Sequence, residues 1–155
     1  MSPQSNALAS PVALLDRIPT DLVQLALRGG LAGIFWSSAR TKVEGLLTIS
    51  DNTYFLFEEE YRLPLIAPDL AAHLATYAEH LLPAMLLLGI GSRFAALGLF
   101  IMTLTIQLFV YPDAFLSTHL GWFALALAIM GRGPGRISLD YLLARKTESR
   151  TSPTA

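Results

Sequence analysis

The sequence contains no cysteine among its 155 residues. This absence excludes disulfide bonds, thiol catalysis and iron–sulfur ligation by the chain itself. Any redox chemistry must therefore come from a bound partner or cofactor. The net charge of -1 and the lack of a basic stripe or an aromatic platform also give no case for nucleic-acid binding.

Charged residues are scarce and unevenly placed. They make up 15% of the chain, against 53% hydrophobic residues and a mean hydropathy of +0.49, which is unusual for a water-soluble domain. Four apolar runs contain only two formal charges, Arg28 and Glu79. The runs cover residues 22–39, 70–91, 94–111 and 114–130. Each is close to the ~20 residues that a helix needs to cross a bilayer.

These runs also lack a polar face. A soluble four-helix bundle would need polar residues to recur about every 3.6 positions along each helix. The segments "AMLLLGIG" and "WFALALAIMG" are instead apolar all round. We therefore predict an all-α protein, a membrane-embedded four-helix bundle over residues 20–146. Disordered tails rich in Ser, Thr and Pro are predicted at residues 1–19 and 147–155.

One long connection separates the first two predicted helices. Its aromatic residues and its block of acids at 58–60 predict an interfacial loop, with the aromatic rings at headgroup level and the acids in water. The expected anchors are Tyr54, Phe55, Phe57 and Tyr61. Outside the runs, seven Lys and Arg residues lie on the side of both termini and three on the side of this loop. This bias predicts cytoplasmic termini and an extracytoplasmic loop in a bacterial inner membrane.

The two charges inside the runs predict an ion pair. An ionised carboxylate in hydrocarbon is costly, so Glu79 should be paired, protonated or in contact with a wet cavity. At a rise of about 1.5 Å per residue, Arg28 and Glu79 differ in depth by ~7 Å, within reach of an arginine side chain. Two interpretations remain open here. The pair either fixes how the first two helices dock, or forms a site for a proton, a quinone head group or an anion.

Further polar residues fall in the outer half of the predicted bundle. His73, Tyr77 and His80 recur along one stripe of the second helix, with Glu79 about 100° away around the helix. The other members of this group are Gln107 on the third helix and His119 and Trp122 on the fourth. Together they predict a polar cavity. A metal site at the three histidines is the weaker alternative, because their spacing matches no known ligand signature, and no metal ligand is predicted.

Small residues on the first predicted helix suggest a packing role. Gly29 and Gly33 form a small-xxx-small pair, which is expected to let a neighbouring helix approach closely. Trp36, near the outer end of the same helix, is most simply an interfacial anchor. These residues are therefore expected to have structural roles.

The segment after the last run predicts a short amphipathic helix. Ser138 is expected to cap it, with apolar residues on the membrane and basic residues at anionic headgroups. Asp140 stands out among these basic residues. It is expected either as an acid favoured by the helix dipole or as a clamp on Arg132 or Arg136.

Three segments together resemble the DoxX family of four-helix integral membrane proteins, over roughly residues 20–145. They are "LALRGGLAGIFWSSARTK", "LPLIAPDLAAHLATYAEHLLPAMLLLGIGSRFAAL" and "GPGRISLDYLL". The resemblance singles out Arg28, Lys42, Glu79, Arg93 and Asp140 in this sequence. The last-named acid and Arg93 are expected to be structural. The histidines are not part of this pattern.

The family is named for its similarity to the membrane subunits of thiosulfate:quinone oxidoreductase, and members are linked to oxidative-stress defence and to redox partner proteins. The resemblance therefore implies a small membrane subunit for quinone-linked electron transfer or redox defence. A bound quinone and a redox partner protein are the implied cofactor and partner, in contact with the lipid bilayer. Whether the chain is itself an enzyme, and whether it forms a homo-oligomer, stays open.

In this interpretation the predicted cavity would hold the quinone head group. Glu79 or His80 would exchange the proton, and Arg28 would set the charge of the acid. The expected ligand-binding residues are Arg28, Lys42, Gln107, His119 and Trp122. Two other classes of function remain open. One is a small transporter for a metal ion or an anion, and the other is a membrane scaffold without chemistry.

Overall fold

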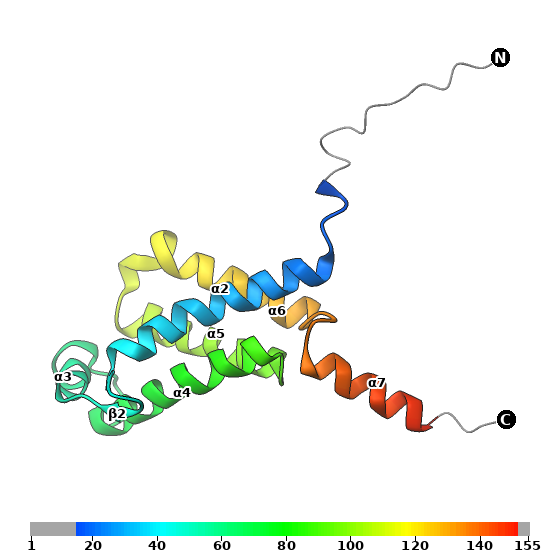
Figure 1. Cartoon of the computed structure of the whole chain (residues 1–155). Coiled ribbons are helices and arrows are strands. Elements are labelled where there is room, and N and C mark those ends of the chain that lie inside the picture. The colour runs from blue at the N-terminus through cyan, green and yellow to red at the C-terminus, as the bar shows by residue number, and fades with distance from the viewer. Residues whose placement is uncertain (1–14, 152–155) are drawn as a thin grey trace, which may run out of the picture.

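The computed structural model describes residues 15–151, with side chains up to residue 147. It is mostly helical, which confirms the predicted all-α class. Four helices pack together, namely α2 (Thr20–Thr41), α4 (Pro68–Leu88), α5 (Ser92–Phe109) and α6 (Leu120–Arg132). A further helix, α7 (Leu139–Thr151), points away from them (Figure 1).

Shorter elements lie between these helices. A two-stranded antiparallel hairpin and two short helical segments connect α2 to α4, and two more segments connect α5 to α6. They are β1 (Val43–Glu44), β2 (Thr48–Ile49), α3 (Asp51–Phe55), the π-helix η1 (Leu56–Tyr61), the 3-10 helix η2 (Pro112–Ala114) and the π-helix η3 (Phe115–His119). We call the end of the bundle beside β1, β2, α3 and η1 the loop end, and the opposite end, where α7 departs, the α7 end (Figure 1).

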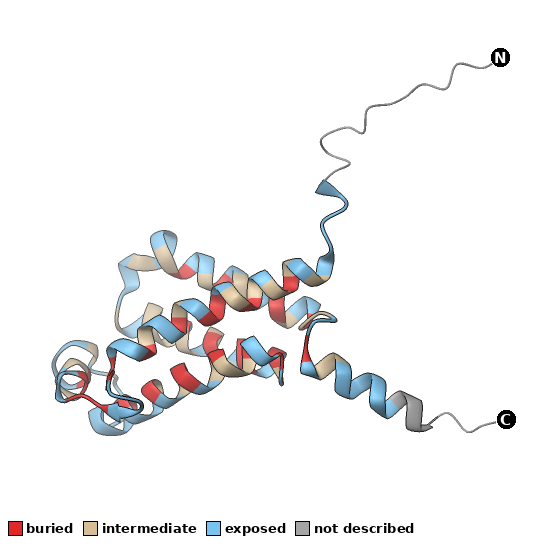
Figure 2. Ribbon diagram, in the orientation of Figure 1, coloured by how far each residue is buried: buried red, intermediate tan, exposed pale blue. Residues whose placement is uncertain are grey.

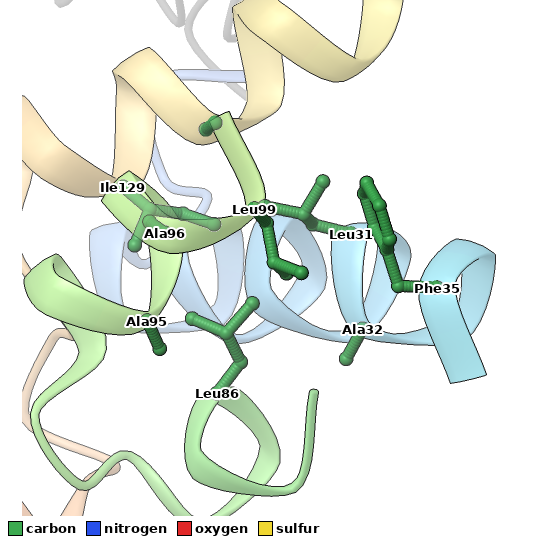
Figure 3. Close-up of a cluster of buried hydrophobic side chains, with 9 residues drawn as sticks. Leu31, Ala32, Phe35, Leu86, Ala95, Ala96, Leu99 and Ile129 are labelled. Carbon is green, nitrogen blue, oxygen red and sulfur yellow. The ribbon is translucent and has the colours of Figure 1, made fainter. Parts of the chain in front are cut away.

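One apolar core joins the four packed helices. Helix α2 packs against α4 and α6, and α5 packs against α4 and α6. Figure 3 shows side chains from these helices meeting at the centre. The buried members are Leu31, Ala32, Phe35, Leu86, Ala95, Ala96, Leu99, Ala126 and Ile129. Because several are alanines, the helix backbones can approach closely and gain dispersion contacts.

The helices are apolar on the outside and carry polar groups inside. Buried residues face inward and exposed residues face outward on each packed helix (Figure 2). Large exposed side chains include Leu74, Leu81, Phe94, Ile101, Leu108 and Leu127. Buried polar side chains include Gln24, Arg28, Thr76, Glu79, Thr103 and His119. An exterior this apolar differs from that of a soluble bundle, whose outer helix faces are polar. The segments Ser92–Phe109 and Pro112–Arg132 are long and apolar enough to cross a membrane.

Turn chemistry explains where α4 and α5 begin and end. Pro68 occupies the first turn of α4, where its missing N–H costs nothing. Gly89 ends α4 with φ of 71°, and Gly91 precedes α5 with φ of 55°. Both angles lie in the left-handed region, which glycine adopts most easily. The chain therefore reverses within three residues, and α4 and α5 are antiparallel neighbours.

Two predicted boundaries are wrong. The last apolar run, 114–130, was expected to be one helix, but its first six residues form parts of η2 and η3, and the α-helix begins only at Leu120. The predicted C-terminal tail starts inside a helix, since α7 continues to Thr151. Most of the predicted N-terminal tail, residues 1–14, and residues 152–155 of the C-terminal tail lie outside the described residues.

The connection between α2 and α4 also differs from the expected interfacial loop. Phe57 was expected at headgroup level, but it is buried against Ala71 and Ala72 at the start of α4, with Tyr54 and Tyr61 packed beside it. The acids at 58–60 are exposed, as predicted. The segment therefore folds onto the helices because Phe57 gains more contacts there than a flat interfacial position would offer.

Candidate functional site

Lys42 and Glu79 form a buried ion pair. Lys42 follows the last residue of α2, and its Nζ atom lies 2.8 Å from Oε2 of Glu79 in the middle of α4. The same ammonium donates to the Ser38 hydroxyl at 2.8 Å. Only 5% of Lys42 and 3% of Glu79 is exposed. Mutual attraction offsets part of the cost of removing both charges from water.

The predicted pairing of Arg28 with Glu79 is wrong. Arg28 is fully buried, and its guanidinium donates to the carbonyl of Leu86 at 3.2 Å and to the carbonyl of Ile137. Leu86 lies two turns beyond Glu79, ~10 Å further along α4. The depths estimated from the sequence placed Arg28 ~7 Å from Glu79, whereas it bonds a carbonyl ~10 Å away along α4. The prediction also assumed that the Lys42 side chain lies outside the bundle, whereas it is long enough to pair with Glu79.

Asp140 organises the α7 end through backbone groups. Its carboxylate accepts hydrogen bonds from the backbone N–H of Gly91 at 2.8 Å and of Ser92 at 3.1 Å. These groups belong to the N-terminus of α5, where unpaired N–H groups and the helix dipole favour an acid. The alternative role of Asp140, a clamp on Arg132 or Arg136, is wrong, because among the described side chains neither arginine forms an ion pair with it and Arg136 contacts Asp21 and Tyr141 instead.

Gly89 lets the α7 end close tightly. A Cβ atom at this position would overlap the Arg28 guanidinium and lie 2.8 Å from the Cα of Ser138. Ser138 caps α7 by accepting a backbone N–H at 3.2 Å, which confirms its predicted role. Arg93 lies over Gly133, where a Cβ would be 3.2 Å from the guanidinium. Arg28, Arg93 and Gly89 thus take part in a closed structural junction.

A cavity of about 580 Å³ lies at the loop end, between α2, α4, α5 and the segment from η3 to α6. Its walls are mostly apolar, and η1 contributes Phe57 and Tyr61. Its polar and aromatic lining residues include Ser38, Lys42, Glu79, Thr105, Tyr111, Thr118, His119 and Trp122. The Lys42–Glu79 ion pair is therefore part of the cavity wall. This volume is within the range of small-molecule sites.

Gln107 and His119 are joined in a short hydrogen-bond chain. Nδ1 of His119 lies 2.7 Å from Oε1 of Gln107, and the Gln107 amide nitrogen donates to the carbonyl of Pro112 at 2.6 Å. His119 is 2% exposed, and its ring packs against Trp122 with centroids 5.2 Å apart. The three residues predicted on the third and fourth helices are therefore adjacent, as expected from their matched depths.

The histidines of α4 lie apart from the cavity. His80 bonds the carbonyl of Thr76 through Nδ1 at 2.7 Å, and its ring packs edge-on against Trp36 at 5.4 Å. His73 lies at the surface, where it bonds Tyr54 and the Asp69 carbonyl. Among the described side chains, no group of three or more His, Asp or Glu residues is placed to hold a metal ion. His80 was expected to border the same polar cavity as Glu79, but it is not among the residues that line it.

The predicted packing role of Gly29 and Gly33 is not fulfilled within this chain. A Cβ atom at either glycine would meet nothing within 4 Å among the described residues. Both line an outward groove with Trp36 and Ala84. The spacing identified a smooth helix face correctly, but it could not tell which way that face points.

Two tyrosines line the cavity, Tyr61 and Tyr111, and neither was predicted there, since Tyr61 was expected only as an interfacial anchor. Tyr111 donates a hydrogen bond to Glu60, and the rings of Tyr61 and Tyr111 lie 6.0 Å apart, edge to face. The hydrogen bond to Glu60, followed by burial, raises the pKa of Tyr111, and burial raises the pKa of Tyr61. Both phenols are therefore neutral hydroxyls at physiological pH. Their separation in sequence gave no signal of this contact.

Helices with an apolar exterior and a few polar side chains buried between them are typical of a helical membrane protein. A model of the DoxX family matches residues 23–112, and since these are 90 of the 155 residues, the chain belongs to the DoxX family. The match includes Lys42 and Glu79 but ends before His119 and Trp122. No curated protein and no solved structure matches the chain.

Proposed function

We propose that this chain is a four-helix membrane subunit that binds the head group of a quinone in the loop-end cavity and works with a redox partner protein. The observation that carries the proposal is the buried Lys42–Glu79 ion pair in the wall of an otherwise mostly apolar cavity. An apolar lining with a few polar groups suits a lipophilic ring that carries polar oxygens.

The ion pair supplies the two interactions that such a ring requires. The Lys42 ammonium can donate to a ring oxygen, and the Glu79 carboxylate can accept or return a proton. Trp122 offers an aromatic face for the ring. When bound, a quinone supplies two-electron redox chemistry in the lipid phase. Arg28, which was expected to set the charge of Glu79 and to bind the ligand, instead donates to backbone carbonyls at the α7 end.

A partner protein is part of the proposal because the chain contains no cysteine. It therefore cannot hold an iron–sulfur cluster through thiolates or oxidise a substrate through a thiol pair. The partner would hold the substrate and its redox centre. The bundle would hold the quinone at the membrane.

Orientation in a bacterial inner membrane is the second part of the proposal. The excess of Lys and Arg near both termini favours cytoplasmic termini and an extracytoplasmic loop end. Because the sequence lacks cysteine, a single introduced cysteine can be labelled with an impermeant reagent in intact cells. Leu46→Cys, at a site 86% exposed between β1 and β2, should label, and Ala144→Cys on α7 should not. The opposite result would reverse the orientation.

Quinone retention tests the ligand. Purified in mild detergent, the chain should carry extractable ubiquinone or menaquinone in stoichiometric amounts. Glu79→Gln can still accept a hydrogen bond from Lys42, so it should fold, but it should lose quinone-linked electron transfer when the partner is present. Glu58→Gln, an exposed change on η1, is the matched control. Normal electron transfer in Glu79→Gln would refute the proton-exchange role. This is the result expected if the chain is a scaffold without chemistry.

A further inference from the structure

The hydrogen bonds of His119 fix where its ring proton lies. The Pro112 carbonyl can only accept, so the Gln107 amide nitrogen must face it, at 2.6 Å. The amide oxygen of Gln107 then faces Nδ1 of His119, at 2.7 Å. An oxygen acceptor at this distance requires a proton on Nδ1. In the neutral ring, Nε2 is therefore a bare acceptor.

Nε2 of His119 is available to a ligand. It makes no hydrogen bond to the described residues, and it is not among the buried polar atoms that are sealed from solvent. His119 lines the cavity, so this acceptor can be reached from it. His80 provides a contrast, because its Nε2 is both unpartnered and sealed.

Few other groups in the cavity wall can discriminate between a hydroxyl and a carbonyl on the ligand. The Thr118 hydroxyl both donates and accepts, so it can turn to suit either one, and the Thr105 hydroxyl already donates to the carbonyl of Ile101 at 3.0 Å. Lys42 only donates, and Oε2 of Glu79 already accepts from Lys42. His119 adds to the wall an unpartnered nitrogen that can only accept in the tautomer set by Gln107. It therefore interacts favourably with a ligand hydroxyl and unfavourably with a ligand carbonyl.

We infer that Nε2 of His119 accepts a hydrogen bond from a ring hydroxyl of the bound ligand, so that the cavity favours a hydroquinone over the corresponding quinone. This inference rests on the proposed function, since it assumes that the cavity binds the quinone couple. Lys42 would donate to the second ring oxygen. His119 is a specificity-determining residue in this scheme, and it lies outside the family match.

Binding of the oxidised and reduced forms of one probe tests the inference. The probes are decylubiquinone and decylubiquinol, added without oxygen to the full chain in detergent. Trp36→Phe would leave Trp122, in the cavity wall, as the sole tryptophan, so quenching of its fluorescence reports binding. One hydrogen bond contributes roughly 0.5–1.5 kcal/mol, so the reduced probe should bind about 3- to 10-fold more tightly. A tenfold preference would raise the midpoint potential of the bound couple by ~30 mV.

Variants locate the preference. His119→Leu should abolish it while the oxidised probe binds within about twofold of the parent. Gln107→Leu, which frees the ring to change tautomer, should weaken it. His80→Leu is the matched control, because His80 has the same Nδ1 contact to an oxygen but lies outside the cavity, and the preference should persist.

Two results would overturn the inference. Equal binding of both probes by the parent protein, or a preference for the oxidised probe, would show that Nε2 does not accept from the ligand while leaving quinone binding intact. If His119→Leu or Gln107→Leu still preferred the reduced probe as strongly as the parent protein, another group would be responsible for that preference. Failure of both probes to bind the parent protein would instead overturn the proposed function and the inference together.

Discussion

Arg28 and Lys42 are both buried cations, one inside α2 and one just after it, but their binding partners differ in kind. At the α7 end, Arg28 donates hydrogen bonds to the backbone carbonyls of Leu86 and Ile137. At the loop end, Lys42 meets a titratable acid in the wall of a cavity. A buried charge alone therefore does not mark a functional site. What distinguishes the two ends is whether the polar groups lie in a closed junction or in the wall of a cavity.

The contrast extends to the groups around each cation. Asp140 and Gly89 at the α7 end make contacts with the backbone, which fix the junction between α4, α5 and α7. Glu79 and His119 at the loop end have side-chain partners and line a cavity. We expect changes at the α7 end to affect folding, and changes at the loop end to affect binding as well.

A large effect is expected for Gly89→Ala at the α7 end. An alanine at φ of 71° is strained, and its Cβ would overlap the Arg28 guanidinium. Left-handed strain and overpacking together should cost about 2–5 kcal/mol. Unfolding in a denaturing-detergent titration would measure the loss. Gly33→Ala is the control, because a Cβ there meets nothing within 4 Å, and its stability should stay equal or rise.

Ion-pair coupling should be confined to the loop end. Lys42→Met or Glu79→Leu leaves one buried charge unpaired, which should cost about 3–5 kcal/mol if that charge stays ionised. The double change should therefore cost less than the sum of the two single changes in the same unfolding titration. Arg28→Met combined with Glu79→Leu should instead be additive. If the changes at Arg28 and Glu79 were non-additive and those at Lys42 and Glu79 additive, the assignment of the ion pair to the loop end would be wrong.

A smaller loss of stability is expected from Asp140→Ala. The change removes two partly buried hydrogen bonds to the N-terminus of α5, and a favourable charge at a partly buried helix end contributes up to about 2 kcal/mol. Asp113→Ala, in the exposed η2 segment, is the control. Quinone binding should be unchanged in both variants that fold. Loss of quinone from folded Asp140→Ala would show that the two ends are not separate.

The smallest effect concerns the tyrosines that line the cavity. Because the pKa of Tyr111 is raised, the folded chain holds this proton more tightly than the unfolded chain. The resulting stability is present below a pH of about 10 and is lost as the pH rises above it. Absorbance titration of tyrosinate should show late ionisation that Glu60→Gln shifts to lower pH. Identical titration curves would remove Glu60 as the main cause.

Sequence reasoning succeeded where the signal is local. Apolar runs located α2, α4 and α5 to within a few residues, and the pattern after the last run identified the Ser138 cap. It failed where helix rotation and chain reversal decide the contact. The Lys42 side chain folds back past the end of α2, so its pairing with Glu79 could not be read from depth along the helices.

The cavity itself could not be predicted because it is formed between elements. Glu79, Gln107 and His119 were identified from polar residues within apolar runs, and they do lie near the loop end. His80 met the same criterion but turns toward Trp36. Tyr61 was expected only as an interfacial anchor and Tyr111 was not singled out, since aromatic residues near a predicted interface are common in membrane proteins.

Photolabelling with an azidoquinone tests most directly whether the loop-end cavity holds a quinone. Ala78→Phe would fill the cavity that Ala78 lines, and Ala84→Phe would place the same ring in the outward groove beside Gly29 and Gly33. The account predicts labelled peptides from the cavity wall in the parent chain and in Ala84→Phe, and loss of that label in Ala78→Phe. Equal labelling of all three proteins, or labels spread over the lipid-facing surface, would contradict it.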